Sequence, residues 1–199
     1  MQALLGKRPG DEIGEDVDAF LKHLASMAYT RVEVEKSPWF HRVQARLADI
    51  EEAAPLIAAL CREALGRVLE LAAGMELRFH PAHGDFTPWN TRIDASHLQA
   101  FDWEFFNADA PALFDRFHWI VQTGVLVQRK SCEEIYSQAL RLTAEGTETE
   151  REIQLLFAMY LIDVLIRDEW IFKHGRPKFP QVEWMSEGRR ALLERTLGV

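Results

Sequence analysis

The residues with the clearest chemical potential lie in one short segment of the 199-residue chain. His83, Asp85 and Asn90 follow the spacing His-x-Asp-x-x-x-x-Asn, and Asp102 lies at the end of a predicted strand. Phosphoryl transfer needs a carboxylate beside the accepting hydroxyl and oxygen ligands for magnesium. Because Mg²⁺ keeps several of its waters, a few protein ligands are sufficient. The spacing therefore indicates a site for phosphate chemistry.

On both sides of this segment the apolar residues recur at helical spacing. It predicts helices at about 15–28, 39–52, 55–72, 132–142, 148–173 and 184–197, and a further helix that Pro111 opens and that runs to about residue 128. Ser37 before Pro38 is the expected N-cap of the second helix. Residues 76–79 are expected as a strand, 80–90 as a loop, 91–93 and 98–101 as a hairpin turning at 94–96, and the residues up to 110 as another loop.

Three pieces of the sequence, in order, resemble one known family. Residues 83–90 read HGDFTPWN, which is similar to the HGDxxxxN loop of aminoglycoside phosphotransferase and choline kinase-like proteins. Residues 101–104 read FDWE, which resembles the hydrophobic-Asp-Trp-Glu metal segment of that family. Pro111 and Asp115 match a recurrent proline and aspartate at the start of the next helix. Protein kinases usually carry arginine where Gly84 stands, so the small-molecule branch is favoured.

The resemblance implies a role for each residue of the site. Asp85 would be the catalytic aspartate, which orients the acceptor hydroxyl and accepts its proton. Asn90 and Asp102 would hold Mg²⁺ on the phosphates of ATP. His83 would support the catalytic loop, and Asp115 would cap its helix or tie it to that loop.

This family usually builds its acceptor pocket from the last helices of the chain. Asp163, Asp168, Glu169 and Trp170 gather there, and Glu104 is a further candidate for contact with the substrate. Carboxylates would suit an amine or polyhydroxyl substrate, and an aromatic side chain would suit a quaternary ammonium group or a sugar face. The alternative is a solvated helix face beside an apolar core stripe.

The expected fold is mainly α (α+β), the helical C-terminal lobe of a protein kinase-like fold with a short β-hairpin. Residues 1–14 are predicted as a hinge remnant and loop, and 15–199 as the lobe, with its C-terminal helices over 111–197. No G-x-G-x-x-G segment precedes the catalytic loop, so the N-lobe is expected to be absent from this chain. A truncated chain, a late gene start, a split kinase with a separate N-lobe and an inactive remnant all stay open.

Composition limits the other classes of function. The net charge of -8 argues against nucleic-acid binding. No apolar run reaches membrane-spanning length, and two distant cysteines argue against a disulfide framework, so a cytoplasmic protein is expected. The expected activity is transfer of the γ-phosphate of ATP to a hydroxyl of a small molecule such as an aminoglycoside, a choline-like amine, a sugar or an amino alcohol.

Two other interpretations stay open. A kinase-like lobe without an N-lobe would serve as a non-catalytic binding or scaffold module. Alternatively, His80, His83 and Asp85 would bind a transition metal and support hydrolysis. A turn rich in Asp and Asn would also account for the loop without any function, because these residues are common in turns.

Overall fold

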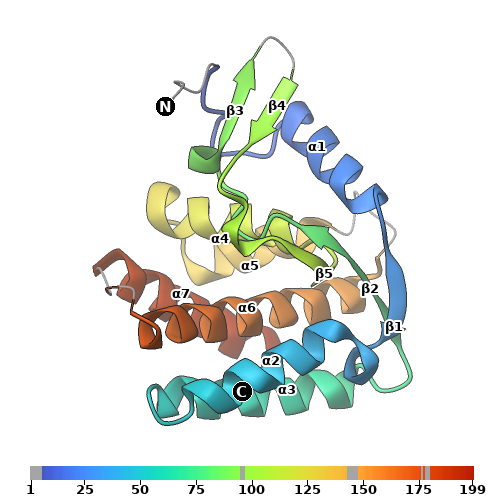
Figure 1. Ribbon diagram of the computed structural model, residues 1–199, viewed down its shortest axis with the longest axis vertical. Coiled ribbons are helices and arrows are strands. Elements are labelled where there is room, and N and C mark those ends of the chain that lie inside the picture. Colours follow the sequence, from blue (N-terminus) through green and yellow to red (C-terminus); the bar gives the residue numbers. More distant parts are fainter. Residues whose placement is uncertain (1–5, 95–96, 143–147, 176, 178–179) are drawn as a thin grey trace.

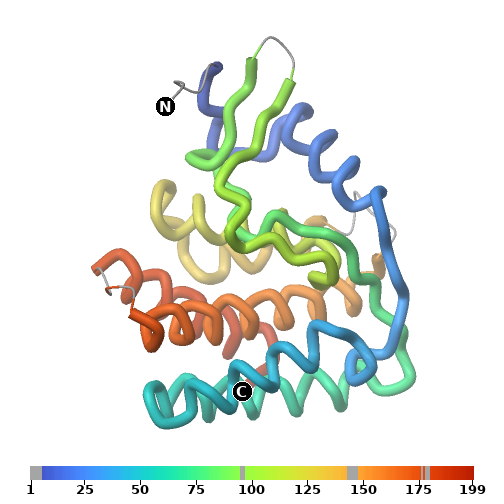
Figure 2. Tube along the Cα trace, viewed as in Figure 1, coloured from blue at the N-terminus to red at the C-terminus, as the bar shows by residue number. Residues whose placement is uncertain are grey.

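The computed structural model describes residues 6–94, 97–142, 148–175, 177 and 180–199. It is mainly helical with two small antiparallel sheets, which confirms the mainly α (α+β) class. Figure 1 shows the helices stacked in layers, with a β-hairpin standing beyond one end of the stack. The course of the chain through these layers is easiest to follow in the tube of Figure 2.

The helices and strands have the following bounds. The helices are α1 (Glu15–Ser26), α2 (Pro38–Ile50), α3 (Pro55–Leu71), α4 (Phe114–Thr123), α5 (Cys132–Leu140), α6 (Glu150–Lys173) and α7 (Pro180–Leu197). The strands are β1 (Thr30–Glu33), β2 (Glu76–Ala82), β3 (Thr91–Asp94), β4 (His97–Ala100) and β5 (Asn107–Pro111). Three short turns of 3₁₀-helix are η1 (Val34–Lys36), η2 (Pro88–Asn90) and η3 (Trp103–Phe105), and η4 (Gly124–Gln128) is a π-helical segment that continues α4.

Helix α6 forms the centre of the helical stack. It packs against α2 and α3 on one side and against α4, α5 and α7 on the others (Figure 1). Nearly every side chain from Ile153 to Arg167 is buried, because this helix is apolar around most of its circumference and not along one stripe. Thr149 begins the helix with a reciprocal capping box to Glu152. The helix is therefore a fixed frame for the polar residues near its C-terminal end.

Local signals account for the start of α2 and the break before α3. The side chain of Ser37 accepts a hydrogen bond from the backbone N–H of Phe40, and Pro38 is the first helical residue, so the predicted N-cap is confirmed. Ala54 has φ -139° and ψ 62°, outside the helical region. The predicted break at Pro55 is confirmed for the same reason that predicted it, because the residue before a proline is pushed out of the α region.

The sheet around β2 differs from the prediction. Its strand order is β1-β2-β5, and neither β1 nor β5 was expected. Pro111 pairs with Phe79 at the end of β5 and does not open a helix; α4 starts only at Phe114. The predicted C-terminal helices over 111–197 therefore begin three residues late. β5 reads Asn-Ala-Asp-Ala-Pro, a composition with weak strand propensity, so its pairing depends on the neighbouring strand.

The second sheet is the predicted hairpin. β3 and β4 pair from Thr91↔Ala100 to Asp94↔His97, so Asp94 belongs to β3. The other two residues of the predicted turn at 94–96 lie outside the described residues. The backbone N–H of Phe101 donates to the carbonyl of Asn90 (3.1 Å), which extends the pairing by one step. The hairpin therefore holds the end of the 83–90 loop beside the start of the 101–104 segment. Of the predicted hinge remnant and loop at 1–14, residues 1–5 also lie outside the described part.

We expect Ser37→Ala to lower the free energy of unfolding by about 1–2 kcal/mol, because α2 loses its N-cap acceptor in a buried position. Urea unfolding of the two proteins, followed by circular dichroism, would measure the difference. Ser26→Ala is the matched control, since Ser26 is exposed at the end of α1 and bonds only the carbonyl of His23. Equal losses in both variants would contradict the assigned role of Ser37.

Candidate active site

The beginning of the 83–90 loop is anchored by one buried carboxylate. Asp115, in the first turn of α4, accepts the backbone N–H of His83 on Oδ2 (2.7 Å) and that of Gly84 on Oδ1 (2.9 Å). Asp115 does not cap its own helix, which begins with the backbone of Leu113 in the N-cap position. Burial raises the pKa of Asp115 to about 6, although the two N–H donors act in the opposite direction. Asp115 therefore ties α4 to the loop.

Gly84 lets the loop pass close to the segment that follows the hairpin. Its φ is +86°, and a Cβ atom there would collide with the backbone carbonyl of Phe105. Only glycine adopts this conformation without strain and leaves room for the neighbour. The carbonyl of Gly84 accepts a hydrogen bond from Nη1 of the buried Arg167 (2.6 Å). Helices α4 and α6 thus hold this part of the loop from two sides.

His83 connects the loop to the segment before Asp102. Its Nδ1 accepts the backbone N–H of Asp85 (3.3 Å), so Nε2 carries the ring proton and donates to the carbonyl of Phe101 (3.0 Å). Burial lowers the pKa of His83, which favours this neutral form. The ring also packs against Trp103, with 4.4 Å between ring centroids. In this arrangement His83 supports the loop and is not placed to carry protons.

The carboxylate of Asp85 is held by a side chain on each oxygen. Nε2 of His118 donates to Oδ1 (2.8 Å), and Nδ2 of Asn90 donates to Oδ2 (2.8 Å). Burial acts to raise the pKa of Asp85, but the hydrogen bond from His118 and the charge of Arg167 bring it below its ordinary value. The side chain keeps 25% of its surface exposed. Asp85 is therefore an ionised, oriented carboxylate with an open side.

His118 was not predicted as a site residue. It is fully buried, and burial lowers its pKa to about 4 despite the contact with Asp85. The ring is therefore neutral at neutral pH, with Nε2–H donated to Asp85 and Nδ1 accepting from the hydroxyl of Tyr160 (3.3 Å). The available signal was its spacing, because His118 lies three residues after Asp115 on the same face of α4.

Asn90 and Asp102 provide two oxygen donors at the base of the hairpin. Both Nδ2 hydrogens of Asn90 are used, since this atom also donates to the backbone carbonyl of Asp85 (2.9 Å), which leaves Oδ1 for another partner. Asp102 is exposed and has a left-handed backbone, with φ 68° and ψ 57°. Such a conformation in a residue other than glycine is often found at functional sites. Hard amide and carboxylate oxygens of this kind fit Mg²⁺.

The transition-metal interpretation of His80, His83 and Asp85 is wrong. Within the described ranges, no three His, Cys, Asp or Glu side chains are grouped to hold a metal. Nε2 of His80 accepts the N–H of Leu113 (3.4 Å), and Nδ1 donates to the carbonyl of Pro81 (2.8 Å). Both ring nitrogens are thus already used.

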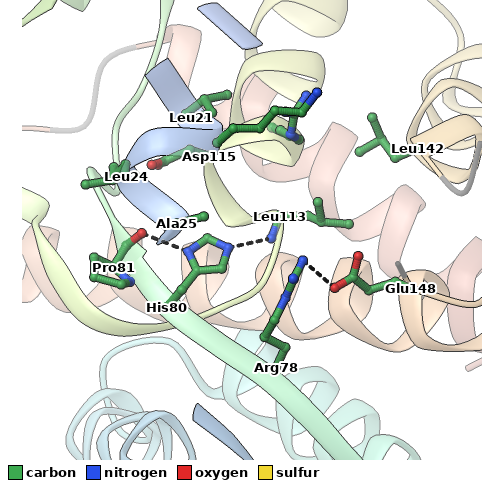
Figure 3. Close-up of a pocket in the computed structure, with 12 residues that line it drawn as sticks. Leu21, Leu24, Ala25, Arg78, His80, Pro81, Leu113, Asp115, Leu142 and Glu148 are labelled. Atoms are coloured by element: carbon green, nitrogen blue, oxygen red, sulfur yellow. Dashed lines mark hydrogen bonds and ion pairs between the residues drawn. The ribbon is translucent and has the colours of Figure 1, made fainter. Parts of the chain in front are cut away.

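Figure 3 shows His80 in a separate cavity of about 100 Å³. Asp115 lies at the boundary of this cavity, and the ion pair between Arg78 and Glu148 (2.5 Å) forms part of its wall. The histidine ring lies between Pro81 and Leu113, and Asp85 is not among the residues that line this cavity. The cavity is therefore separate from the candidate catalytic site.

A larger cavity of about 420 Å³ opens beside Asp85, between the loop, α4, α6 and α7. Its polar lining consists of Asp85, Gln122, Arg167, Asp168, Gln181 and Arg189. The rest is apolar and includes Leu126, Ile171, Val182 and Met185. The π-helical η4 segment contributes Leu126. The volume of the cavity is in the usual range for small-molecule sites. We call this the acceptor cavity, after the acceptor pocket that the sequence predicts, since Asp85 and residues of the last helices line it.

Only one of the predicted substrate residues lines the acceptor cavity. Asp168 does, whereas Asp163 is buried elsewhere, where it accepts a hydrogen bond from Nε1 of Trp39 (3.0 Å). Trp170 packs under the guanidinium of Arg46, 5.4 Å from its ring centroid. The predicted cluster is not one site, because successive residues of a helix face different directions.

Glu104 and Glu169 do not line the acceptor cavity either. Glu104 borders a smaller cavity of about 120 Å³ together with Asp163. Arg167 borders both spaces and separates them. Arg167, like His118, was not predicted as a site residue.

No protein-family model, curated protein or solved structure matches this chain. In the part of the chain that the structure describes, no helix combines the length and the apolar character needed to cross a membrane. The function is therefore argued from the geometry of the site.

The buried carboxylate of Asp115 should make stability depend on pH. Its pKa is 3.8 in the reference state and about 6 in the fold, so the folded chain binds more protons between these values. The contribution of Asp115 to the free energy of unfolding is then fully present below pH 4 and is lost as the pH rises through 6. Relative to the Asp115→Asn variant, the free energy of unfolding of the wild type should fall by roughly 1–3 kcal/mol between pH 4 and pH 6.

Urea unfolding at pH 4, 5, 6 and 7 would measure this difference. Asp16→Asn is the control, since Asp16 is exposed in the first turn of α1. The wild type and Asp16→Asn should give parallel profiles. If the free energy of unfolding of Asp115→Asn also changed with pH in parallel with that of the wild type, the raised pKa of Asp115 would be contradicted.

Proposed function

We propose that this chain is the catalytic, C-terminal part of a phosphotransferase that moves the γ-phosphate of ATP to a hydroxyl of a small molecule. The observation that carries the proposal is the ionised carboxylate of Asp85, held on both oxygens and facing a cavity of about 420 Å³. Such a carboxylate can accept a hydrogen bond from an alcohol and turn its oxygen toward a phosphate. Asn90 bonds this carboxylate, and Asp102 follows the hairpin that starts after Asn90.

The low pKa of Asp85 suits this chemistry. In phosphoryl transfer the transition state is loose, and the proton of the acceptor hydroxyl leaves late. Positioning of the hydroxyl therefore matters more than the strength of the base. Asp85 would orient the hydroxyl and take its proton at Oδ1 or Oδ2 as the new phosphate ester forms. His118, neutral and buried, would keep the carboxylate in place through this step.

Asn90 and Asp102 would hold Mg²⁺ together with the phosphates of ATP. When bound, the ion would neutralise charge on the transferred group. The hairpin would keep the two oxygen donors together, because its base joins Asn90 to Phe101. His83 would fix the same junction from the side of the loop.

The resemblance to the aminoglycoside phosphotransferase and choline kinase-like family supports the same assignment. We therefore propose the C-lobe of a protein kinase-like fold, a cytoplasmic location, and an N-lobe elsewhere, in the same protein or in a partner, that grips the nucleotide.

A non-catalytic binding module is the second candidate. It is favoured by one observation: among the described residues before β2 there are helices α1 to α3 and strand β1, without a glycine-rich hairpin.

Asp102→Asn should weaken the binding of ATP in the presence of magnesium, because one charged ligand of the ion is lost. Calorimetric titration of the chain with ATP, with and without magnesium, would measure it. We expect a loss of about tenfold in affinity with magnesium and little change without it. Asp16→Asn is the control and should bind as the wild type does. Undiminished magnesium-dependent binding in Asp102→Asn would contradict the metal assignment. No ATP binding by this chain alone would mean that the separate N-lobe supplies the grip on the nucleotide, and the titration would then be repeated with that lobe present.

Asp85→Asn should reduce phosphate transfer by a factor of about 10²–10⁴, the range for a positioned acid–base group. The assay would follow labelled phosphate from ATP to a panel of small alcohols, using the protein together with any N-lobe that its coding sequence or a partner supplies. Asparagine preserves the size of the side chain, so circular dichroism should show an intact fold. Transfer at the wild-type rate in Asp85→Asn would rule out its catalytic role.

A further inference from the structure

The acceptor cavity has no carboxylate left for a cationic substrate. Of the described residues that line it, only Asp85 and Asp168 are acidic. Asp168 is already paired with Arg189 through Oδ2 and lies 3.9 Å from Nε of Arg167 through Oδ1. Asp85 is required for the acceptor hydroxyl if the proposed function holds. An ammonium group in this cavity would therefore lack an acidic partner of its own.

Two aromatic rings in the lining already face guanidinium groups. Arg8 lies over the ring of Trp89, 5.6 Å from its centroid, and Arg167 lies over Phe105 at 4.6 Å. Aromatic faces attract cations through their negative quadrupole. A quaternary ammonium group beside either ring would also meet the like charge of the arginine already there. These rings are thus poorly suited to a choline-like head group.

The two arginines of the cavity also have donors that remain unused. Arg167 is 7% exposed and Arg189 is 2% exposed. The buried Nε–H of Arg189 has no hydrogen-bond partner within the described residues, and that of Arg167 has only the ion-pair contact of 3.9 Å with Asp168. Buried donors without acceptors are costly, and a charged acceptor forms a strong bond with a guanidinium group. Both arginines line the cavity, so a carboxylate bound there would lie beside their guanidinium groups, whereas an amine would add further donors.

We infer that the acceptor is a hydroxy compound with an apolar body and a carboxylate or similar anionic group, and not an amine. The inference deepens the proposed function and rests on it for the role of the hydroxyl. The apolar wall formed by Leu126, Ile171, Val182 and Met185 would take the body. Arg167 and Arg189 would take the anionic group, and Asp85 the hydroxyl at the other end.

Three matched probes test the inference. They are para-hydroxymethylbenzoate, benzene-para-dimethanol and para-aminomethylbenzyl alcohol, which share a ring and a hydroxymethyl group and differ in the second group. Ligand-observed NMR titration of the chain without nucleotide would give the three dissociation constants. We expect the carboxylate to bind about tenfold more tightly than the diol, the value of one charge-assisted hydrogen bond, and the ammonium compound to bind most weakly.

Arg189→Gln should remove the preference for the carboxylate and leave binding of the diol unchanged. Arg190→Gln is the matched control, because Arg190 is the next residue of α7 and is exposed. If Arg189→Gln does not fold, the paired change Asp168→Asn with Arg189→Gln removes both charges together and should bind carboxylate and diol equally.

Tightest binding of the ammonium probe, a carboxylate preference that survives the change at Arg189, or no binding of any probe would overturn the inference. None of these results depends on phosphate transfer. Failure of the proposed function would instead appear as unchanged transfer in Asp85→Asn, so the two failures are distinguishable.

Discussion

The candidate site is organised around the need of buried backbone N–H groups for acceptors. Where the chain leaves β2 it enters a loop, and two of its amides are shielded from water without a strand partner. A single carboxylate, that of Asp115, accepts both. Buried amides are almost always paired in this way. Because Asp115 and His118 lie on the same face of α4, the helix that anchors the loop also supplies the donor to Asp85.

Arg167 is the second constraint, and it acts through charge. A buried guanidinium needs several partners to offset its desolvation. It donates to the carbonyl of Gly84, packs over the ring of Phe105 and lies near the carboxylate of Asp168. These partners come from the loop, from η3 and from α6 itself. The arginine therefore joins the loop to the central helix and divides the acceptor cavity from the smaller cavity that Glu104 borders.

The charges of the cavity follow from how these anchors are paired. Arg189 and Arg167 between them neutralise Asp168, so the carboxylate that faces the open space is Asp85. The π-helical segment η4 continues α4, packs against α7 and contributes Leu126 to the wall of the cavity. Such segments frequently occur at functional sites. The result is a cavity with an apolar wall whose lining also holds two carboxylates and two guanidinium groups.

The site motif and most helix bounds were predictable because their causes are local. The Ser37–Pro38 pair and Pro55 act on neighbouring backbone, and one short hairpin is enough to bring Asn90 next to the segment of Asp102. The pairing of β1 and β5 with β2 was not predictable, since Asn107–Pro111 has weak strand propensity and gains its partner only in the fold.

The same distinction applies within the site. The sequence alone indicated which side chains we propose for phosphate and metal, because they lie within twenty residues of one another. The tertiary structure decided what surrounds them. His118 and Arg167 bond to loop residues that lie 33 and 83 positions away in the sequence. Asp163 and Asp168 belong to the same helix but line different cavities. Contacts at such separations depend on how helices pack against one another, and packing is a property of the whole core and not of any segment.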